Sequence, residues 1–396
     1  MPNKRMTELG ENRSVIRDLF EYGMQRKKIV GNDKVYDFSI GNPSIPAPEK
    51  VNETLIWLLQ NTESTSLHGY SSAAGDMAVR QAVADNINRR FSQHVTAGDI
   101  YMTCGAAASL TISLNALLVP GEEVVVLAPF FPEYAVFIEK AGGVLRSVPA
   151  VKPDFAPDLE VLRGSINEKT RVLIINSPNN PSGAVISAEV LQKICGILEE
   201  KSKEFGAPIY IVADEPYREL VYSGVDVPYI MNFYKNTLVC YSYSKSLSLP
   251  GERIGYIAVC PDAEQRAKLF AAVSGAGRAL GYVCAPVLFQ KMLLTCVDEK
   301  TNLSAYEENR ALLYDALSSM GYTCIKPEGA FYLFVEAPGG DDAAFCEMAK
   351  KYDLLLVPSA SFGLPGYMRL AYCVAKSTIE NALPAFRALA KECGLC

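Results

Sequence analysis

Residues 240–256 read CYSYSKSLSLPGERIGY, and they place one lysine, Lys245, among hydroxyl side chains directly after an apolar run. A lysine with small, neutral neighbours loses its proton readily, and a neutral amine can form a Schiff base with a carbonyl. Ser242, Ser244 and Arg253 are the donors that would surround a phosphate. The stretch indicates a lysine that holds a phosphorylated aldehyde cofactor, although taken alone it would better fit a serine-rich turn with a structural lysine and arginine.

The pattern Ser-x-Ser-Lys followed by Leu-Pro-Gly-x-Arg-x-Gly resembles the cofactor-lysine signature of the class I and II aminotransferases, of the aspartate aminotransferase type. These are fold type I enzymes that use pyridoxal 5′-phosphate. The resemblance implies an α/β fold, with a large domain of helices around a mostly parallel sheet of seven strands and a small α+β domain. It places the large domain at residues 46–287 and the small domain at 288–396, with 1–45 as an arm that contributes to the small domain.

The residues after the apolar runs support this interpretation. From Ile100 onward, such runs alternate with helix-length segments, which is typical of a parallel sheet whose strand ends gather ligands. The run 209–213 ends in Asp214, where a carboxylate is costly unless a cation pairs with it. A protonated pyridine nitrogen would be such a cation, and the carboxylate would keep the ring an electron sink. The alternative is an aspartate that caps a helix.

The order of the polar groups matches the family as well. Asn180, Asp214, Tyr217, Lys245 and Arg253 occur in the family's order, each after a strand-like run. The resemblance implies that Asn180 and Tyr217 contact the cofactor's 3′-oxygen and that Ser242 and Arg253 bind its phosphate. It assigns catalysis to Lys245, Asp214 and Tyr217, with Lys245 as the general base and acid that moves a proton at the substrate Cα.

Three further segments are expected around the cofactor. Small residues at 104–109 precede a helical run and would expose backbone N–H groups to a phosphate, and the resemblance assigns this loop to Gly105, Ala106 and Ala107. An aromatic ring after the run 124–127 could stack on a flat ring; Phe131 is the better match and Phe130 its rival. Tyr70 matches a tyrosine that reaches the neighbour's cofactor phosphate, which implies a homodimer with shared active sites.

The substrate contacts follow from the same resemblance. Gly41 would lie beside the substrate carboxylate, and Arg369 would bind that carboxylate through two parallel hydrogen bonds, with Asn180 nearby. Arg278 lies near the position that supplies an arginine for a second carboxylate across the dimer. We therefore expect aspartate or glutamate as the amino donor and a 2-oxo acid as the acceptor.

The composition excludes several other classes. The chain has 396 residues and a formal net charge of −6, so it offers no basic surplus for nucleic acid. It shows no signal peptide and no apolar span long enough for a bilayer, which predicts a cytoplasmic protein. The eleven cysteines lie in apolar contexts and read as reduced thiols, and two histidines leave few candidates for a metal site, so no metal is expected.

Two alternatives remain open from the sequence. The same cofactor site would serve a C–S β-lyase or an enzyme similar to aminocyclopropane-carboxylate synthase. A regulator that senses pyridoxal phosphate is the alternative from another class. Such regulators carry an N-terminal DNA-binding domain, and the forty residues before Gly41 leave no room for one.

Overall fold

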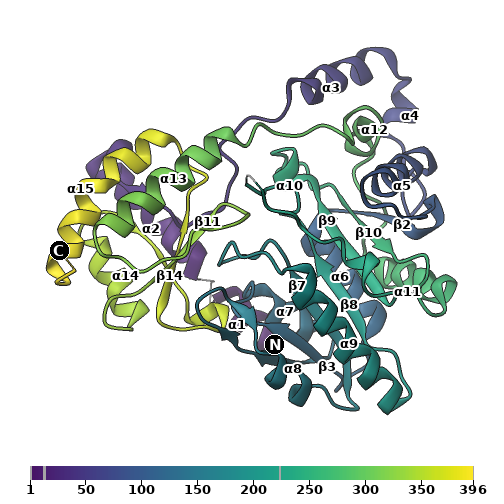
Figure 1. Cartoon of the computed structure of the whole chain (residues 1–396). Coiled ribbons are helices and arrows are strands. Elements are labelled where there is room, and N and C mark those ends of the chain that lie inside the picture. Colours follow the sequence, from purple (N-terminus) through teal and green to yellow (C-terminus); the bar gives the residue numbers. More distant parts are fainter. Residues whose placement is uncertain (1, 12–14, 223, 396) are drawn as a thin grey trace.

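The computed structural model describes residues 2–11, 15–222 and 224–395, and its largest element is a seven-stranded sheet (Figure 1). β10 runs antiparallel to both of its neighbours, and the other strands pair in parallel. The predicted α/β class with a mostly parallel sheet is confirmed. The strand order is β2 (Ile100–Thr103), β10 (Gly255–Val259), β9 (Thr237–Ser242), β8 (Tyr210–Asp214), β7 (Thr170–Asn176), β3 (Glu123–Leu127) and β4 (Val144–Val148).

Helices cover this sheet, and the central strands are buried along almost their whole length, as parallel strands with two covered faces should be. Asp76, Asp158 and Ser187 begin three of these helices, because each side chain accepts N–H groups of the first turn. The helices of this unit are α3 (Glu49–Asn61), α4 (Ser64–His68), α5 (Met77–Phe91), α6 (Ala106–Leu117), α7 (Glu133–Lys140), α8 (Leu159–Ser165), α9 (Ala188–Phe205), α10 (Tyr243–Ser246), α11 (Arg266–Ala279) and α12 (Val287–Cys296). Of these, α3 and α4 pack against α12 at the edge of the unit (Figure 1).

A second layered unit joins the two ends of the chain. Its antiparallel sheet has the order β11 (Tyr332–Glu336), β14 (Tyr367–Ala371) and β13 (Val357–Pro358), and β1 (Tyr36–Asp37) pairs with β12 (Leu354–Leu355). Figure 1 shows the purple α2 beside the yellow C-terminal helices. The helices of this unit are α2 (Val15–Val30), α13 (Ser304–Ser319), α14 (Asp342–Lys350) and α15 (Lys376–Glu392). The first helix, α1 (Lys4–Glu11), lies instead beside the larger unit, where Arg5 pairs with Glu139 of α7.

Short elements complete the chain. The strands β5 (Ala150–Val151) and β6 (Ala156–Pro157) form a hairpin. The 3₁₀ helices are η1 (Asn32–Lys34), η2 (Ala97–Asp99), η3 (Ile230–Asn232) and η4 (Ala360–Phe362).

The buried apolar side chains form two large clusters. The first runs from Val51 to Cys296 and contains the seven-stranded sheet, whereas the second combines Phe38 with residues from Tyr217 to Ala390. Helix α12 contributes Met292 and Leu293 to the first cluster. The division at 1–45, 46–287 and 288–396 stays a prediction.

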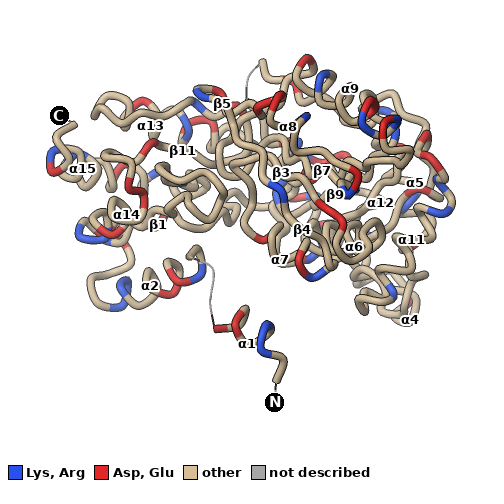
Figure 2. The backbone as a smooth tube through the Cα atoms, turned by 90° about the horizontal axis from the view of Figure 1, so that it is seen from below, with Lys and Arg blue, Asp and Glu red and all other residues tan. Residues whose placement is uncertain are grey.

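Charged residues are spread over the whole chain. Figure 2 shows acidic and basic positions interspersed along the backbone rather than gathered in one tract. Within the described ranges, no helix combines the length and the apolar character needed to cross a membrane. The same residues contain no group of three metal-binding side chains and no disulfide.

Candidate active site

The carboxyl ends of three neighbouring strands meet at one cavity of about 330 Å³. Asn176 on β7 lies opposite Asp214 on β8, and Asp214 lies opposite Cys240 on β9, two residues before the strand ends at Ser242. Parallel strands therefore bring side chains that are far apart in sequence to a common edge. Predicted site residues on the cavity wall are Gly41, Ala106, Ala107, Phe131, Asn180, Asp214, Tyr217, Ser242, Lys245, Arg253 and Arg369.

Lys245 lies on the short helix α10, which begins where β9 ends. Ser242 caps this helix, because its Oγ accepts the N–H of Ser244 at 3.2 Å. The Nζ of Lys245 donates to the carbonyl of Gly41 at 2.6 Å. Burial lowers the pKa of Lys245 to about 8, and the positive charges of Arg369 and Arg253 act in the same direction. About a tenth of this amine is therefore neutral at pH 7, far more than for a lysine in water, and this fraction is available as a nucleophile.

Asp214 is a buried carboxylate with one free oxygen. Its Oδ2 accepts from the hydroxyl of Tyr134 at 2.5 Å, whereas its buried Oδ1 has no hydrogen-bond partner among the described residues. Burial raises the pKa of Asp214 to about 7, although the hydrogen bond from Tyr134 lowers it. A buried carboxylate oxygen without a donor is costly, so the site suits a ligand that presents a cationic N–H there.

Arg369 lies on β14 of the smaller unit, and its side chain lines the cavity at the edge of the large sheet. It is almost fully buried, and it donates from Nη1 to the Oδ1 of Asn180 at 3.0 Å and from Nη2 to the carbonyl of Ser39 at 2.5 Å. Its Nε has no partner, and in the described part of the chain no aspartate or glutamate pairs with it. A buried guanidinium that bonds only neutral oxygens is prepared to bind an anionic ligand.

Two tyrosines lie beside this arginine. The hydroxyls of Tyr217 and Tyr332 are 3.0 Å apart, and the ring of Tyr332 faces the Arg369 guanidinium at 4.6 Å. Burial raises the pKa of Tyr217 well above its ordinary value. Tyr217 therefore stays protonated and can donate a hydrogen bond to an oxygen in the cavity.

A third group of donors surrounds the start of α6. The hydroxyls of Ser242 and Ser244 are 2.6 Å apart, and Arg253 donates to the carbonyls of Pro250 and Cys104. Gly105 has φ +87°, and a Cβ at this position would lie 2.8 Å from the Arg253 Nη2. The absence of a side chain thus lets the guanidinium approach the helix N-terminus, and such an arrangement of N–H groups and cation suits a phosphate.

The two aromatic candidates point in different directions. Phe131 lies on the cavity wall and meets Tyr134 edge to face, with ring centroids 5.7 Å apart. Phe130 is buried, and its ring occupies the space where a side chain at Gly363 would lie. Of the two rings, only Phe131 is thus placed to stack on a ligand in this cavity.

Two predicted residues lie away from the cavity of their own chain. Tyr70 is 89% exposed, and Arg278 lies exposed near the end of α11. Neither lines the cavity.

Among the residues that line the cavity, Ile16, Asn176 and Tyr332 were not predicted. Tyr134, which donates to Asp214 from behind the cavity wall, was not predicted either. Tyr134 lies in the first turn of α7, three residues after Phe131, and its N–H donates to the Phe131 carbonyl at 3.0 Å. The sequence carries this spacing, but it does not carry the contact with Asp214. Ile16 comes from α2, 198 positions before Asp214, and no sequence pattern signals it.

The family profile described as aminotransferase class I and II matches residues 33–386, and the chain belongs to this family. It is an aminotransferase of fold type I. The aspartate aminotransferase of Thermotoga maritima is 29% identical over 97% of both chains, and the probable aspartate/prephenate aminotransferase of Aquifex aeolicus is 31% identical over 90% of this chain and 91% of its own.

Solved structures agree with this assignment. An amino transferase from Eubacterium rectale has a TM-score of 0.97 at 54% identity and covers 98% of both chains. The Thermus thermophilus aspartate aminotransferase with maleate has a TM-score of 0.86 at 26% identity and covers 98% of this chain and 99% of its own.

Proposed function

We propose that the cavity binds pyridoxal 5′-phosphate and that the enzyme transfers the amino group of aspartate or glutamate to a 2-oxo acid. The main observation behind the proposal is the buried Oδ1 of Asp214, which has no hydrogen-bond partner and would accept the N–H of a protonated pyridine ring. The cofactor has three functional ends, and the cavity offers a matching group for each. Lys245 suits its carbonyl, Asp214 its ring nitrogen, and Ser242 with Arg253 its phosphate.

Each residue of the site would then have a separate role in the reaction. Bound pyridoxal phosphate supplies an electron sink for the charge that develops at the substrate Cα. Lys245, with its pKa lowered to about 8, takes and returns a proton at that carbon. Arg369 holds the substrate carboxylate, and Asn180 keeps the guanidinium in place through the 3.0 Å hydrogen bond. Tyr217 donates to the cofactor's 3′-oxygen.

The proposed donors rest on the relatives. Several are named aspartate or aspartate/prephenate aminotransferases, and the Thermus structure contains maleate, a dicarboxylate. The chain's own cavity is lined by three cations, Lys245, Arg253 and Arg369, and each already has a role. A second substrate carboxylate would therefore need a cation from elsewhere, and we assign this role to Arg278 of a second copy.

We propose a homodimer for the same reason. Tyr70 would contact the partner's cofactor phosphate, since it is exposed and lies outside its own cavity. The helices α3 and α5 and the segment before α12 carry large exposed apolar side chains that a second copy would cover, and α3, α4 and α5 all pack against α12. These are Ile56, Trp57, Leu59, Met77 and Val283, each more than half exposed.

The first experiment is a visible absorption titration of the purified protein with pyridoxal phosphate, followed by L-aspartate. A cofactor band that appears with the wild-type protein, fails to appear with Lys245→Ala and changes on addition of aspartate is the expected result. No band in the wild type would overturn the cofactor assignment. Release of pyruvate and ammonia from a cysteine conjugate, without transfer to a 2-oxo acid, would instead identify a lyase.

The role of Arg278 has its own test. We expect Arg278→Ala to lower kcat/KM for aspartate by roughly tenfold to a hundredfold, because a hydrogen-bonded ion pair is lost, and to leave an aromatic donor unaffected. Lys268→Ala, an exposed change on the same helix, is the matched control. Equal kinetics of both variants with aspartate would refute the role of Arg278.

A further inference from the structure

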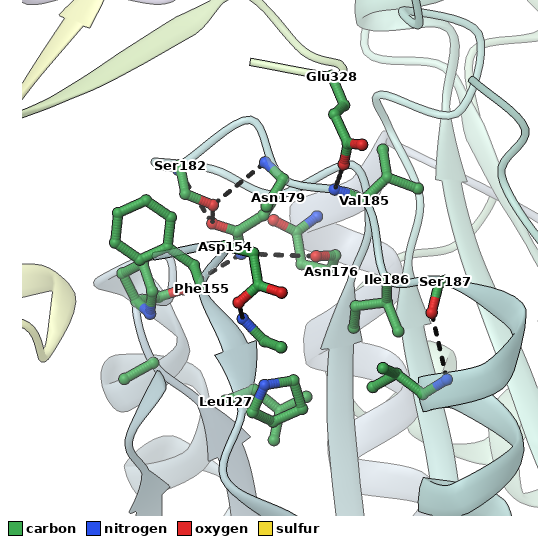
Figure 3. Close-up of a pocket in the computed structure, with 16 residues that line it drawn as sticks. Leu127, Asp154, Phe155, Asn176, Asn179, Ser182, Val185, Ile186, Ser187 and Glu328 are labelled. Atoms are coloured by element: carbon green, nitrogen blue, oxygen red, sulfur yellow. Dashed lines mark hydrogen bonds between the residues drawn. The ribbon is translucent and has the colours of Figure 1, made fainter. Parts of the chain in front are cut away.

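Asn176 is the last residue of β7, and its side chain joins two backbones. Its Nδ2 donates to the carbonyl of Asp214 at 2.8 Å, and its Oδ1 accepts the N–H of Asn180 at 2.8 Å. The side chain is buried, with 8% of the residue exposed. It lies in the wall of the active-site cavity and in that of a neighbouring cavity of about 220 Å³, which Figure 3 shows.

The course of the chain explains why a side chain is needed here. β7 pairs with β8 up to Asn176 and Asp214, and the chain then leaves the sheet through Pro178, which has no N–H to donate. The Asn176 amide therefore continues the ladder in place of the backbone. Buried backbone groups without a partner are costly, so both bonds stabilise the edge of the site.

The two residues whose backbones Asn176 joins, Asp214 and Asn180, also contribute their own side chains to the site. Asp214 offers its free Oδ1 to the cavity, and Asn180 holds Arg369 through its own Oδ1. A single amide thus sets the position of the carboxylate relative to the amide and guanidinium beside it. Asparagine can do this because it has a donor and an acceptor at fixed directions, whereas aspartate has only acceptors and alanine has neither.

We propose that Asn176 is a positioning residue that locks Asp214 and Asn180 into the geometry in which both contact the cofactor. The inference rests on the proposed function, since it concerns the residues assigned there to the ring nitrogen and the 3′-oxygen. Asn176 does not touch the reacting atoms; it acts through the two backbones.

The same loop contains a matched control, Asn179, which Figure 3 shows near Asn176. Its Oδ1 accepts from the N–H and hydroxyl of Ser182, and its Nδ2 donates to the carbonyl of Pro129 at 3.1 Å and, at a longer 3.5 Å, to the backbone carbonyl of Asn176. It makes no hydrogen bond with Asp214 or Asn180. Asn176→Asp and Asn179→Asp therefore make the same chemical change and add the same charge, but only the first breaks the link to Asp214.

The experiment measures the dissociation constant for pyridoxal phosphate by equilibrium dialysis, with the pH dependence of the visible band of the bound cofactor. We expect Asn176→Asp to weaken binding by roughly tenfold to a hundredfold and to displace the pH midpoint of the band, since one buried donor is lost. Asn179→Asp also loses a half-buried donor, to the Pro129 carbonyl, but it should stay within about threefold of the wild type because none of its hydrogen bonds reaches Asp214 or Asn180. A crystal structure of ligand-free Asn176→Asp should show Asn180 displaced relative to Asp214.

The outcomes separate the two proposals. A wild-type protein that does not bind pyridoxal phosphate would refute the proposed function itself. If the wild type binds and Asn176→Asp has the wild-type affinity and pH midpoint, or merely matches Asn179→Asp, the positioning role is refuted. Asn176→Ala, which introduces no charge, should show the same loss of affinity, and it provides the measurement if Asn176→Asp does not fold.

Discussion

Replacing Tyr134 with phenylalanine removes the donor to the Asp214 Oδ2 and leaves this carboxylate without any partner in the ligand-free protein. The hydroxyl donates at 2.5 Å, both residues are buried, and the Asp214 Oδ1 is already unpartnered. A hydrogen bond to a charged group contributes about 1.5–3 kcal/mol, and one to a neutral group about 0.5–1.5 kcal/mol. The cost of Tyr134→Phe therefore depends on whether Asp214 is ionised.

The sign of the pH dependence follows from the raised pKa. Folded Asp214 has a pKa of about 7 against an ordinary value of 3.8. Between these pH values folded Asp214 holds a proton that unfolded Asp214 has lost. The free energy of unfolding therefore falls as the pH rises from about 3.8 towards 7. The difference of about 1.4 kcal/mol between the two kinds of hydrogen bond raises the pKa by about one further unit in Tyr134→Phe. The loss of stability then continues to a higher pH than in the wild type.

Urea unfolding of the ligand-free protein at pH 5 and pH 9 measures this effect. We expect Tyr134→Phe to lower the free energy of unfolding by about 1 kcal/mol at pH 5 and by about 2–2.5 kcal/mol at pH 9. Tyr234→Phe is the matched control, because Tyr234 donates to the neutral carbonyl of Ile209 at 2.7 Å and should cost the same at both values. Equal losses for Tyr134→Phe at both pH values would refute the coupling.

Three further changes test the site. Lys245→Met should stabilise the ligand-free protein at pH 7 by about 2 kcal/mol in urea unfolding, because the amine is buried with its pKa lowered to about 8. The gain should shrink by pH 10, where the folded wild-type amine is neutral and the unfolded amine has begun to lose its own proton. Gly41→Ala should lower the free energy of unfolding by about 1–3 kcal/mol, because the added Cβ would lie 2.1 Å from the Tyr332 hydroxyl. The control is Gly164→Ala, whose added Cβ would have no atom within 4 Å. It should show no such loss in thermal unfolding. Arg369→Lys should lower kcat/KM for aspartate by about a hundredfold, because lysine keeps the charge but cannot form two parallel hydrogen bonds with a carboxylate. The affinity for pyridoxal phosphate should stay unchanged. Equal losses in both quantities would contradict the assignment of Arg369 to the substrate.

The local sequence pattern, together with the resemblance to the class I and II aminotransferases, was enough to predict the fold and most of the residues that gather at the site. Apolar runs that end in Asp214 or lead into Asn180 and Lys245 predict parallel strands, and parallel strands end at one edge. These side chains were therefore expected to meet before any distance was known, and the structure brings them to one cavity. The alternation of apolar runs with helix-length segments is visible in the sequence, so it can be recognised without knowledge of tertiary contacts.

Side-chain directions could not be predicted in the same way. Phe130 and Phe131 are neighbours of the same kind, and only packing against Gly363 turns one ring away from the cavity. The Tyr134–Asp214 bond joins positions 80 residues apart. No local pattern contains such a pair, because it depends on how α7 lies against the end of β8.

By itself, the sequence predicted the α/β class and the mostly parallel sheet, and its resemblance to the aminotransferases supplied most of the polar groups that line the cavity, but not Asn176 and Tyr332. The tertiary structure decided which carboxylate oxygen of Asp214 stays free, how Asn176 joins Asp214 to Asn180, and that Arg369 is bonded only to neutral oxygens. The physical reason is the range of the interactions. Strand and helix patterns arise within a few residues, whereas a buried hydrogen bond or a lowered lysine pKa arises only when distant segments exclude water together.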